Sequence, residues 1–141
     1  MNIRTARIED TDEIVELMKQ LGYPVSQELI EQKLHDFESR SYDQVFVAEI
    51  ESEMIGVISC HITSLFHQDG ASGRITSLVV GREFKRGGIG RALVQKAEEY
   101  FLSNRCVKSE VTSGVQRKAA HSFYEACGYK EDERRFIKIY S

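Results

Sequence analysis

Three glycines, Gly87, Gly88 and Gly90, lie together where a strand-like apolar segment gives way to a helical pattern. Glycine permits positive φ and lets another group approach the backbone closely. A helix beginning here presents the N–H groups of its first turn, and the positive end of its dipole, to an anion. Lys85 and Arg86 add positive charge. The turn therefore predicts a phosphate site, although a sharp strand-to-helix connection alone would also require glycine.

Other phosphate-binding motifs do not fit this turn. A P-loop requires Gly-Lys-Ser or Gly-Lys-Thr, and neither tripeptide occurs in the chain. The dinucleotide pattern GxGxxG is broken, because the spacing here reads Gly88-x-Gly90-x-x-Leu93. An RNA-binding Arg-Gly-Gly segment would be repeated and disordered, whereas this one is single and lies within a folded pattern.

Metal and thiol chemistry are not predicted. Cys60, Cys106 and Cys127 are far apart and lack CxxC spacing, and the histidines form no HxH or HExxH pattern. We therefore expect no metal site and reduced, buried thiols.

The elements that must position the turn follow from periodicity and from capping residues. Helices are expected from Asp10 or Thr11 to Gly22, from Ser26 through Phe37, from the glycine turn to about Leu102, and from about Gln116 to Cys127, with Gly128 as C-cap. Strands are expected at Ile3–Arg7, Val45–Ile50, Ile55–Leu65, Ile75–Val80, Cys106–Val111 and Phe136–Tyr140, with a further short strand at Tyr129. The order predicts one mixed α/β domain, residues 1–141, on a largely antiparallel sheet.

Composition restricts the partners. The chain has 141 residues, a net charge of −3 and 29% charged residues, and its pI is about 5.8. This balance lacks the basic footprint of a nucleic-acid-binding protein. Its apolar runs are shorter than a membrane span, and the N-terminus has no apolar signal region, so we expect a cytoplasmic protein that binds neither membrane nor nucleic acid.

The segment from Leu78 to Leu93 resembles the acetyl-coenzyme A signature of the GNAT superfamily of N-acetyltransferases, L-x-V-x-P-x-x-[RQ]-x-x-G-x-[GA]. The matching positions are Leu78, Val80, Gly88 and Gly90. Two positions depart from it, because Arg82 replaces the common proline and Lys85 replaces Arg or Gln. Neither change removes the backbone N–H groups that would bind a pyrophosphate.

A second block, Ala120–Tyr129, resembles the later motif of the same superfamily, A-x-x-F-Y-x-x-x-G-[FY]. Arg117 stands where asparagine is frequent. The form Arg-x-x-Ala-His-x-Phe-Tyr is similar to that of small-amine acetyltransferases, including aminoalkylphosphonate and aminoglycoside enzymes.

Together the two motifs imply a GNAT fold of the α/β (α+β) class, with a mixed, mostly antiparallel central sheet of six or seven strands and about four flanking helices. The implied reaction is direct transfer of the acetyl group of acetyl-CoA to a primary amine of a small molecule. Two alternatives remain open, an enzyme for protein or peptide amines and a CoA-binding module without turnover. A homodimer is also compatible with the resemblance.

The resemblance implies that the strand ending at Val80 separates from Cys106–Val111 and binds the thioester arm. A backbone N–H at Leu78 or Val79 would polarise the acetyl carbonyl. The residues implied to contact the cosubstrate are Leu78, Val79, Val80, Lys85, Arg86, Gly87, Gly88, Ile89, Gly90, Arg91 and Tyr124.

Two proton transfers need side chains. The resemblance places Tyr124 beside the sulfur, where a phenol can protonate the leaving thiolate. The base is open, because Ser77 stands where many relatives carry Glu. His61, His121 and Glu110 are the candidates, each of which could instead have a purely structural role, and desolvation of the amine could make a dedicated base unnecessary.

Overall fold

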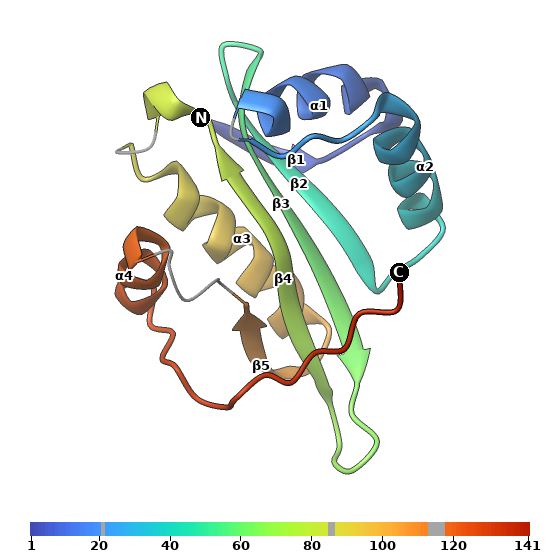
Figure 1. Cartoon of the computed structure of the whole chain (residues 1–141), viewed down its shortest axis with the longest axis vertical. Coiled ribbons are helices and arrows are strands. Elements are labelled where there is room, and N and C mark those ends of the chain that lie inside the picture. The colour runs from blue at the N-terminus through green and yellow to red at the C-terminus, as the bar shows by residue number, and fades with distance from the viewer. Residues whose placement is uncertain (21, 85–86, 113–117) are drawn as a thin grey trace.

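The computed structural model describes residues 1–20, 22–84, 87–112 and 118–141. In these residues the chain forms one mixed sheet whose strands lie side by side in chain order (Figure 1). The strands are β1 (Asn2–Thr5), β2 (Asp43–Ile50), β3 (Glu53–Ser64), β4 (Ala71–Val80) and β5 (Cys106–Val111). β1 to β4 pair antiparallel, and β5 pairs parallel to β4. The mixed, largely antiparallel sheet confirms the predicted class.

Helices cover both faces of the sheet. α1 (Thr11–Gln20) and α2 (Gln27–Glu38) lie on one face, over a core that includes Leu17, Leu34 and Val57. α3 (Ile89–Ser103) lies on the other face, where Leu93 and Phe101 are almost fully buried. α4 (Lys118–Ala126) lies beside α3 near β5, and two short 3-10 turns are η1 (Ile8–Asp10) and η2 (Arg82–Phe84) (Figure 1). No helix in the described ranges is long and apolar enough to cross a membrane.

Ser26, Gly88 and Gly128 lie at helix ends, as their positions in the sequence predict. The Ser26 hydroxyl accepts a hydrogen bond from the Leu29 N–H at 3.1 Å, which caps the start of α2. Gly88 caps the start of α3 with a left-handed φ of 76°, and Gly128 follows α4 with a φ of 95°. Both glycines therefore adopt a backbone conformation that other residues rarely take.

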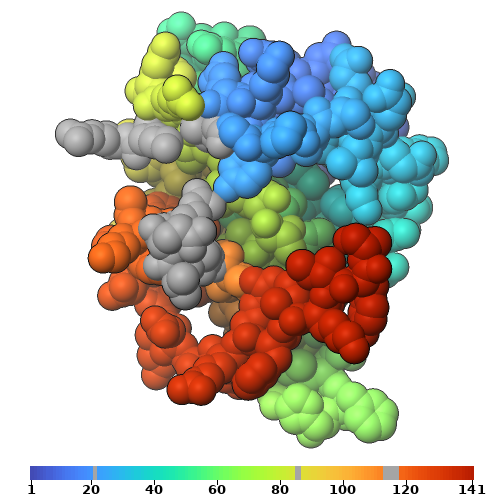
Figure 2. Space-filling view, in the orientation of Figure 1, coloured from blue at the N-terminus to red at the C-terminus, as the bar shows by residue number. Residues whose placement is uncertain are grey.

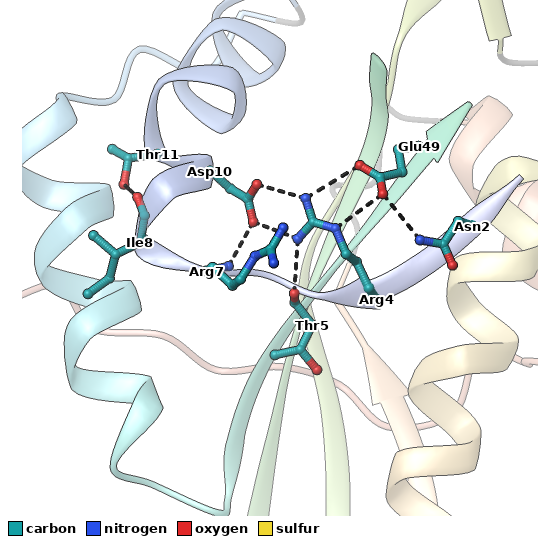
Figure 3. A network of polar contacts seen from close by, with 8 residues as sticks. All are labelled: Asn2, Arg4, Thr5, Arg7, Ile8, Asp10, Thr11 and Glu49. Atoms are coloured by element: carbon teal, nitrogen blue, oxygen red, sulfur yellow. Dashed lines mark hydrogen bonds and ion pairs between the residues drawn. The ribbon is translucent and has the colours of Figure 1, made fainter. Parts of the chain in front are cut away.

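An ionic network holds the start of the chain to the sheet (Figure 3). The Arg4 guanidinium donates two bonds of 2.8 Å to the buried carboxylate of Asp10, and its Nε donates to Glu49 on β2 at 3.2 Å. Asp10 also accepts from the Arg7 N–H at 2.7 Å. This contact turns the backbone into η1, so β1 ends at Thr5 and not at the predicted Arg7.

The prediction of six or seven strands was wrong, because the described residues form five. Neither Phe136–Tyr140 nor Tyr129 is in a strand, and residues 130–141 are exposed. The C-terminal segment crosses the sheet on the viewer's side and does not run along a strand edge (Figures 1 and 2). An alternating apolar pattern gives a strand only when a neighbouring backbone supplies the ladder, and this segment has none in the described chain.

Candidate active site

A cleft lies beside the part of β4 that extends past the end of β5. Their register runs as far as Ile75 opposite Val111, whereas β4 continues from Thr76 to Val80. β5 pairs with β4 up to its last residue, Val111, so the predicted separation of Cys106–Val111 from β4 is not confirmed, and β4 extends past the end of β5. The cleft has a volume of about 80 Å³ and is lined by Met18, Tyr23, Ile75, Thr76, Ser77, Leu78, Val79, Val111, Thr112, Ala120 and Tyr124.

A β-bulge shapes the β4 wall of this cleft. Ser77 pairs with Ser59 on β3 and Ile75 pairs with Cys60, so Thr76 is an extra residue between two ladder pairs. The extra residue shifts the alternation of β4, and Ile75 and Leu78, three positions apart, both pack toward the core under α3. A bulge of this kind redirects side chains. Here it brings the Thr76 hydroxyl to the face that carries α1 and α2.

The Thr76 hydroxyl joins a chain of polar groups that runs back into the sheet. Its Oγ1 lies 2.6 Å from Nε2 of His61 and 2.7 Å from Oγ of Ser59. The other ring nitrogen of His61, Nδ1, lies 2.8 Å from Oδ1 of Asp43. His61 therefore stands one residue behind the cleft wall and connects to it through Thr76.

The glycine turn lies at the start of α3. At Gly88 a Cβ would have no atom of the described residues within 4 Å, so with respect to them the space beside this backbone is open. Ala92 N–H bonds to the Gly88 carbonyl at 3.0 Å, which places Ile89 in the first helical turn with an N–H that needs another acceptor. Lys85 and Arg86, also predicted to bind the cosubstrate, lie outside the described residues.

Packing between α3 and α4 requires glycine at position 90, which the cosubstrate motif alone does not indicate. A Cβ there would lie 3.2 Å from Cζ of Phe123 on α4, so the absence of a side chain allows α3 and α4 to pack closely. Arg91 adds a second link, because its Nη1 donates to the Ala126 carbonyl at 3.4 Å. The turn that begins α3 and the helix that carries Tyr124 are therefore positioned together.

Tyr124 lies in the wall of the cleft with Leu78 and Val79. Its ring packs against those of Phe123 and Tyr129, with centroids 5.1 and 6.1 Å away. The Tyr129 hydroxyl donates to Glu98 on α3 at 2.9 Å. The pKa of Tyr129 is raised, mainly by burial and secondly by the Glu98 carboxylate. The aromatic group fixes the end of α4 against α3.

The other two candidate bases do not line the cleft. Glu110 on β5 is half exposed and pairs with Arg74 at 3.2 Å and with Lys108 at 3.7 Å. His121 lies on α4 but is absent from the described cleft wall. The structure thus brings together Leu78, Val79 and Tyr124, with His61 behind them. Sequence reasoning did not predict Asp43 and Thr76 as site residues. The only feature of the sequence that marks them is that each is a polar residue in a largely apolar strand.

Comparison with known proteins shows the family of the chain. Residues 11–129 match the Acetyltransferase (GNAT) family. The chain therefore belongs to the GNAT family of acetyltransferases, enzymes that use acetyl-CoA as cosubstrate.

Relatives of the chain are named for different acceptors. The chain is 31% identical over 140 residues to aminoalkylphosphonate N-acetyltransferase of Salmonella typhimurium. The match covers 96% of this chain and 89% of that protein. It is 30% identical over 91 residues to human N-alpha-acetyltransferase 30. That match covers 64% of this chain and 25% of the human protein. The crystal structure of an aminoglycoside 6'-N-acetyltransferase from Acinetobacter haemolyticus superimposes with a TM-score of 0.85 at 17% identity, covering 100% of this chain and 99% of that one.

Proposed function

We propose that this protein transfers the acetyl group of acetyl-CoA directly to a primary amine of a small molecule. The observation that carries the proposal is the position of Tyr124, which lines the cleft formed by the part of β4 beyond its pairing with β5. One small site thus combines free strand backbone with a proton donor.

The chain has backbone groups suited to hold acetyl-CoA. From Ser77 to Val80, β4 has no ladder partner in β5, so among the described residues the backbone polar groups on that side could serve a pantetheine-like arm. Open space beside Gly88 lets a pyrophosphate approach the first turn of α3, where N–H groups and the helix dipole favour an anion. We assign the amides from Gly87 to Arg91 to this role, together with Lys85 and Arg86.

Acetyl-CoA supplies an activated acyl group and a thiolate leaving group. In the cleft, the backbone N–H of Leu78 or Val79 would stabilise the charge that develops on the acetyl oxygen. Tyr124 would donate its phenolic proton to the departing sulfur, because a phenol with a pKa near about 10 is protonated at neutral pH. Both groups lie on rigid elements, a bulged strand and a packed helix.

A small-molecule acceptor is favoured by the extent of the relationships. The aminoalkylphosphonate enzyme matches this chain over nearly its whole length. The match to the human N-alpha-acetyltransferase covers only about two thirds of the chain, so a protein N-terminus is the second candidate.

Thiol release from acetyl-CoA tests the proposal over a panel that contains an aminoalkylphosphonate, an aminoglycoside, simple alkylamines and short peptides with free N-termini. We expect turnover with one or more small amines and little with peptides. Exclusive turnover of peptides would assign a protein acceptor, and acetyl-CoA binding without any turnover would indicate a binding module. Light scattering on the same preparation tests for a homodimer.

A further inference from the structure

We propose that Thr76 and His61 form the proton relay that deprotonates the acceptor amine, with Asp43 as the positioning residue behind them. The proposal rests on the proposed amine acetylation, and it assigns the base that the sequence leaves open. Thr76 is the group that would touch the substrate, whereas His61 would receive the proton through it.

The cleft itself poses the problem that the relay solves. An alkylamine has a pKa near about 10.4, so at neutral pH it enters as an ammonium ion and cannot attack a thioester. The described residues that line the cleft include no carboxylate and no imidazole. The side chains there that can exchange a proton are hydroxyls, those of Tyr23, Thr76, Ser77, Thr112 and Tyr124. A hydroxyl accepts a proton at neutral pH only when it passes its own to a stronger base.

Thr76 is a cleft hydroxyl that has such a base behind it. An ionised Asp43 can only accept hydrogen bonds, so the 2.8 Å contact requires a proton on Nδ1 of His61. In a neutral imidazole Nε2 is then the acceptor, and the Thr76 hydroxyl must donate to it across 2.6 Å. The 2.7 Å contact with Ser59 is then a bond that Ser59 donates to Thr76. The remaining lone pair of Thr76 Oγ1 is available to the cleft.

The proton transfer balances without another reactant. One N–H bond of the substrate ammonium breaks as its proton moves to Oγ1 of Thr76, while the original Thr76 proton moves to Nε2 of His61. The amine becomes neutral and can attack, Thr76 is again a hydroxyl, and His61 becomes an imidazolium. A carboxylate on Nδ1 stabilises that imidazolium and holds the ring in the required tautomer. The imidazolium later returns its proton to water.

The surroundings of His61 favour this state. The side chain of Asp43 is only 10% exposed, and its second oxygen lies 3.4 Å from Nη1 of Arg40. Phe37 on α2 packs edge-on against the imidazole, with centroids 5.7 Å apart. Arg74 stands opposite His61 in the β3–β4 register, but its guanidinium bonds Glu110 and Thr112. The charged group bonded to the imidazole is therefore the Asp43 carboxylate.

The bulge explains why Thr76 can serve both partners. An unbroken ladder would place residue 76 opposite a β3 residue, with its side chain alternating toward the α3 core. As the extra residue between two ladder pairs, Thr76 instead faces His61 and the cleft at the same time. The bulge thus brings a proton acceptor to the amine.

The Thr76→Val variant tests the relay, because it removes the hydroxyl and keeps the branched shape. With an alkylamine, kcat/KM should fall by about 100-fold, the lower end of the range for general acid–base catalysis. Thr76→Ser keeps the hydroxyl and should restore most of the activity. Thr63→Val replaces an exposed threonine of β3 that does not line the cleft, and it is the matched control expected to behave as wild type.

A second readout separates proton transfer from a structural role. For a weakly basic amine, which is already neutral at the assay pH, the loss in Thr76→Val should be much smaller than for an alkylamine. Asp43→Asn should show the same dependence on amine basicity, and both variants should recover activity as the pH rises toward the pKa of the alkylamine. A damaged fold would reduce turnover of both kinds of amine alike.

Nitrogen NMR of the imidazole supplies a third readout that needs no turnover. We expect neutral His61 to carry its proton on Nδ1, and the Nε2 resonance to shift in Thr76→Val. A proton on Nε2 in neutral His61 would overturn the relay. The relay would also be overturned if Thr76→Val acetylated an alkylamine as fast as the wild type. In that case the proposed acetyltransferase function would still hold. An absence of turnover with every amine would overturn the proposed function and the relay together.

Discussion

The backbone of Gly90 on α3 lies against the ring of Phe123 on α4, so that a Cβ at Gly90 would stand 3.2 Å from Cζ and 3.3 Å from Cε1. Phe123 precedes Tyr124, which lines the cleft. The space left by one missing side chain therefore sets where α4, and with it the proposed acid, lies relative to the start of α3.

Gly90→Val should lower both stability and activity, because the added side chain pushes Phe123 and α4 away from α3. The cost of such overpacking is about 1–3 kcal/mol. Phe123→Ala should be less harmful in the Gly90→Val background than in the wild type, because it also relieves the clash. Urea unfolding of the four proteins measures this coupling. Strictly additive free energies would show that the two residues do not restrain each other.

Gly88→Val should act through the ligand. A Cβ there meets no atom of the described part of the chain within 4 Å, so we expect the change to cost the strain of a left-handed φ, about 1–2 kcal/mol. The branched side chain would occupy the space through which a pyrophosphate approaches the amides. Calorimetry should show a large loss of acetyl-CoA affinity in a folded protein, and unchanged affinity would remove Gly88 from the phosphate site.

Tyr124→Phe removes one hydroxyl and preserves the aromatic packing with Phe123 and Tyr129. If the phenol protonates the sulfur, kcat and kcat/KM should fall together by about 100-fold while KM for acetyl-CoA stays nearly constant. Steady-state kinetics with chemistry shown to be rate-limiting measures this. A variant that keeps most of its kcat would leave Tyr124 with a packing role alone.

Gly73→Ala should destabilise the fold severely. A Cβ at Gly73 on β4 would lie 2.4 Å from Cγ of Phe101, which is 1% exposed and has no room to move. We expect a loss of about 3 kcal/mol or more in urea unfolding. Gly87→Ala is the control, because the nearest atom of the described residues would lie 3.5 Å from the added Cβ, and its stability should change by less than about 0.5 kcal/mol.

Asp10 should contribute stability that depends on pH. The Arg4 guanidinium lowers the pKa of this buried carboxyl below its ordinary value of 3.8. Folding therefore favours the ionised form, and the contribution is complete above pH 4 and disappears as the pH falls through the lower folded-state pKa. Asp10→Asn should cost about 2 kcal/mol at pH 7, and the difference from wild type should shrink below pH 4. A difference independent of pH would contradict this assignment.

The elements that sequence reasoning predicted well have local signals. Cys106–Val111 is a strand with the predicted bounds, and α3 begins after Gly88, because apolar periodicity and a required left-handed residue are both readable within a few positions. The segment Phe136–Tyr140 has the same strand-like composition but lies unpaired in the described chain. Composition indicates that a segment is able to join a sheet. It does not indicate whether a neighbouring strand is there to pair with it.

The site was predictable only in part for the same reason. Leu78 and Tyr124 belong to motifs, so their neighbourhood could be inferred before any coordinates. The contacts among Asp43, His61 and Thr76 depend on the register of three strands and on one bulge. A shift of one residue would turn these side chains to the opposite face, and no local pattern determines that register.

The order of the strands has a consequence for synthesis. Proteins emerge from the ribosome N-terminus first, so β1 to β4 are complete before α3 and β5 exist. The nascent sheet then exposes the face that α3 later covers, including Ile58 and Cys60, which become fully buried. Until α3 docks, this apolar surface is open to chaperones and to other nascent chains. A translational pause shortly after β4 should therefore increase aggregation more than a pause after α3.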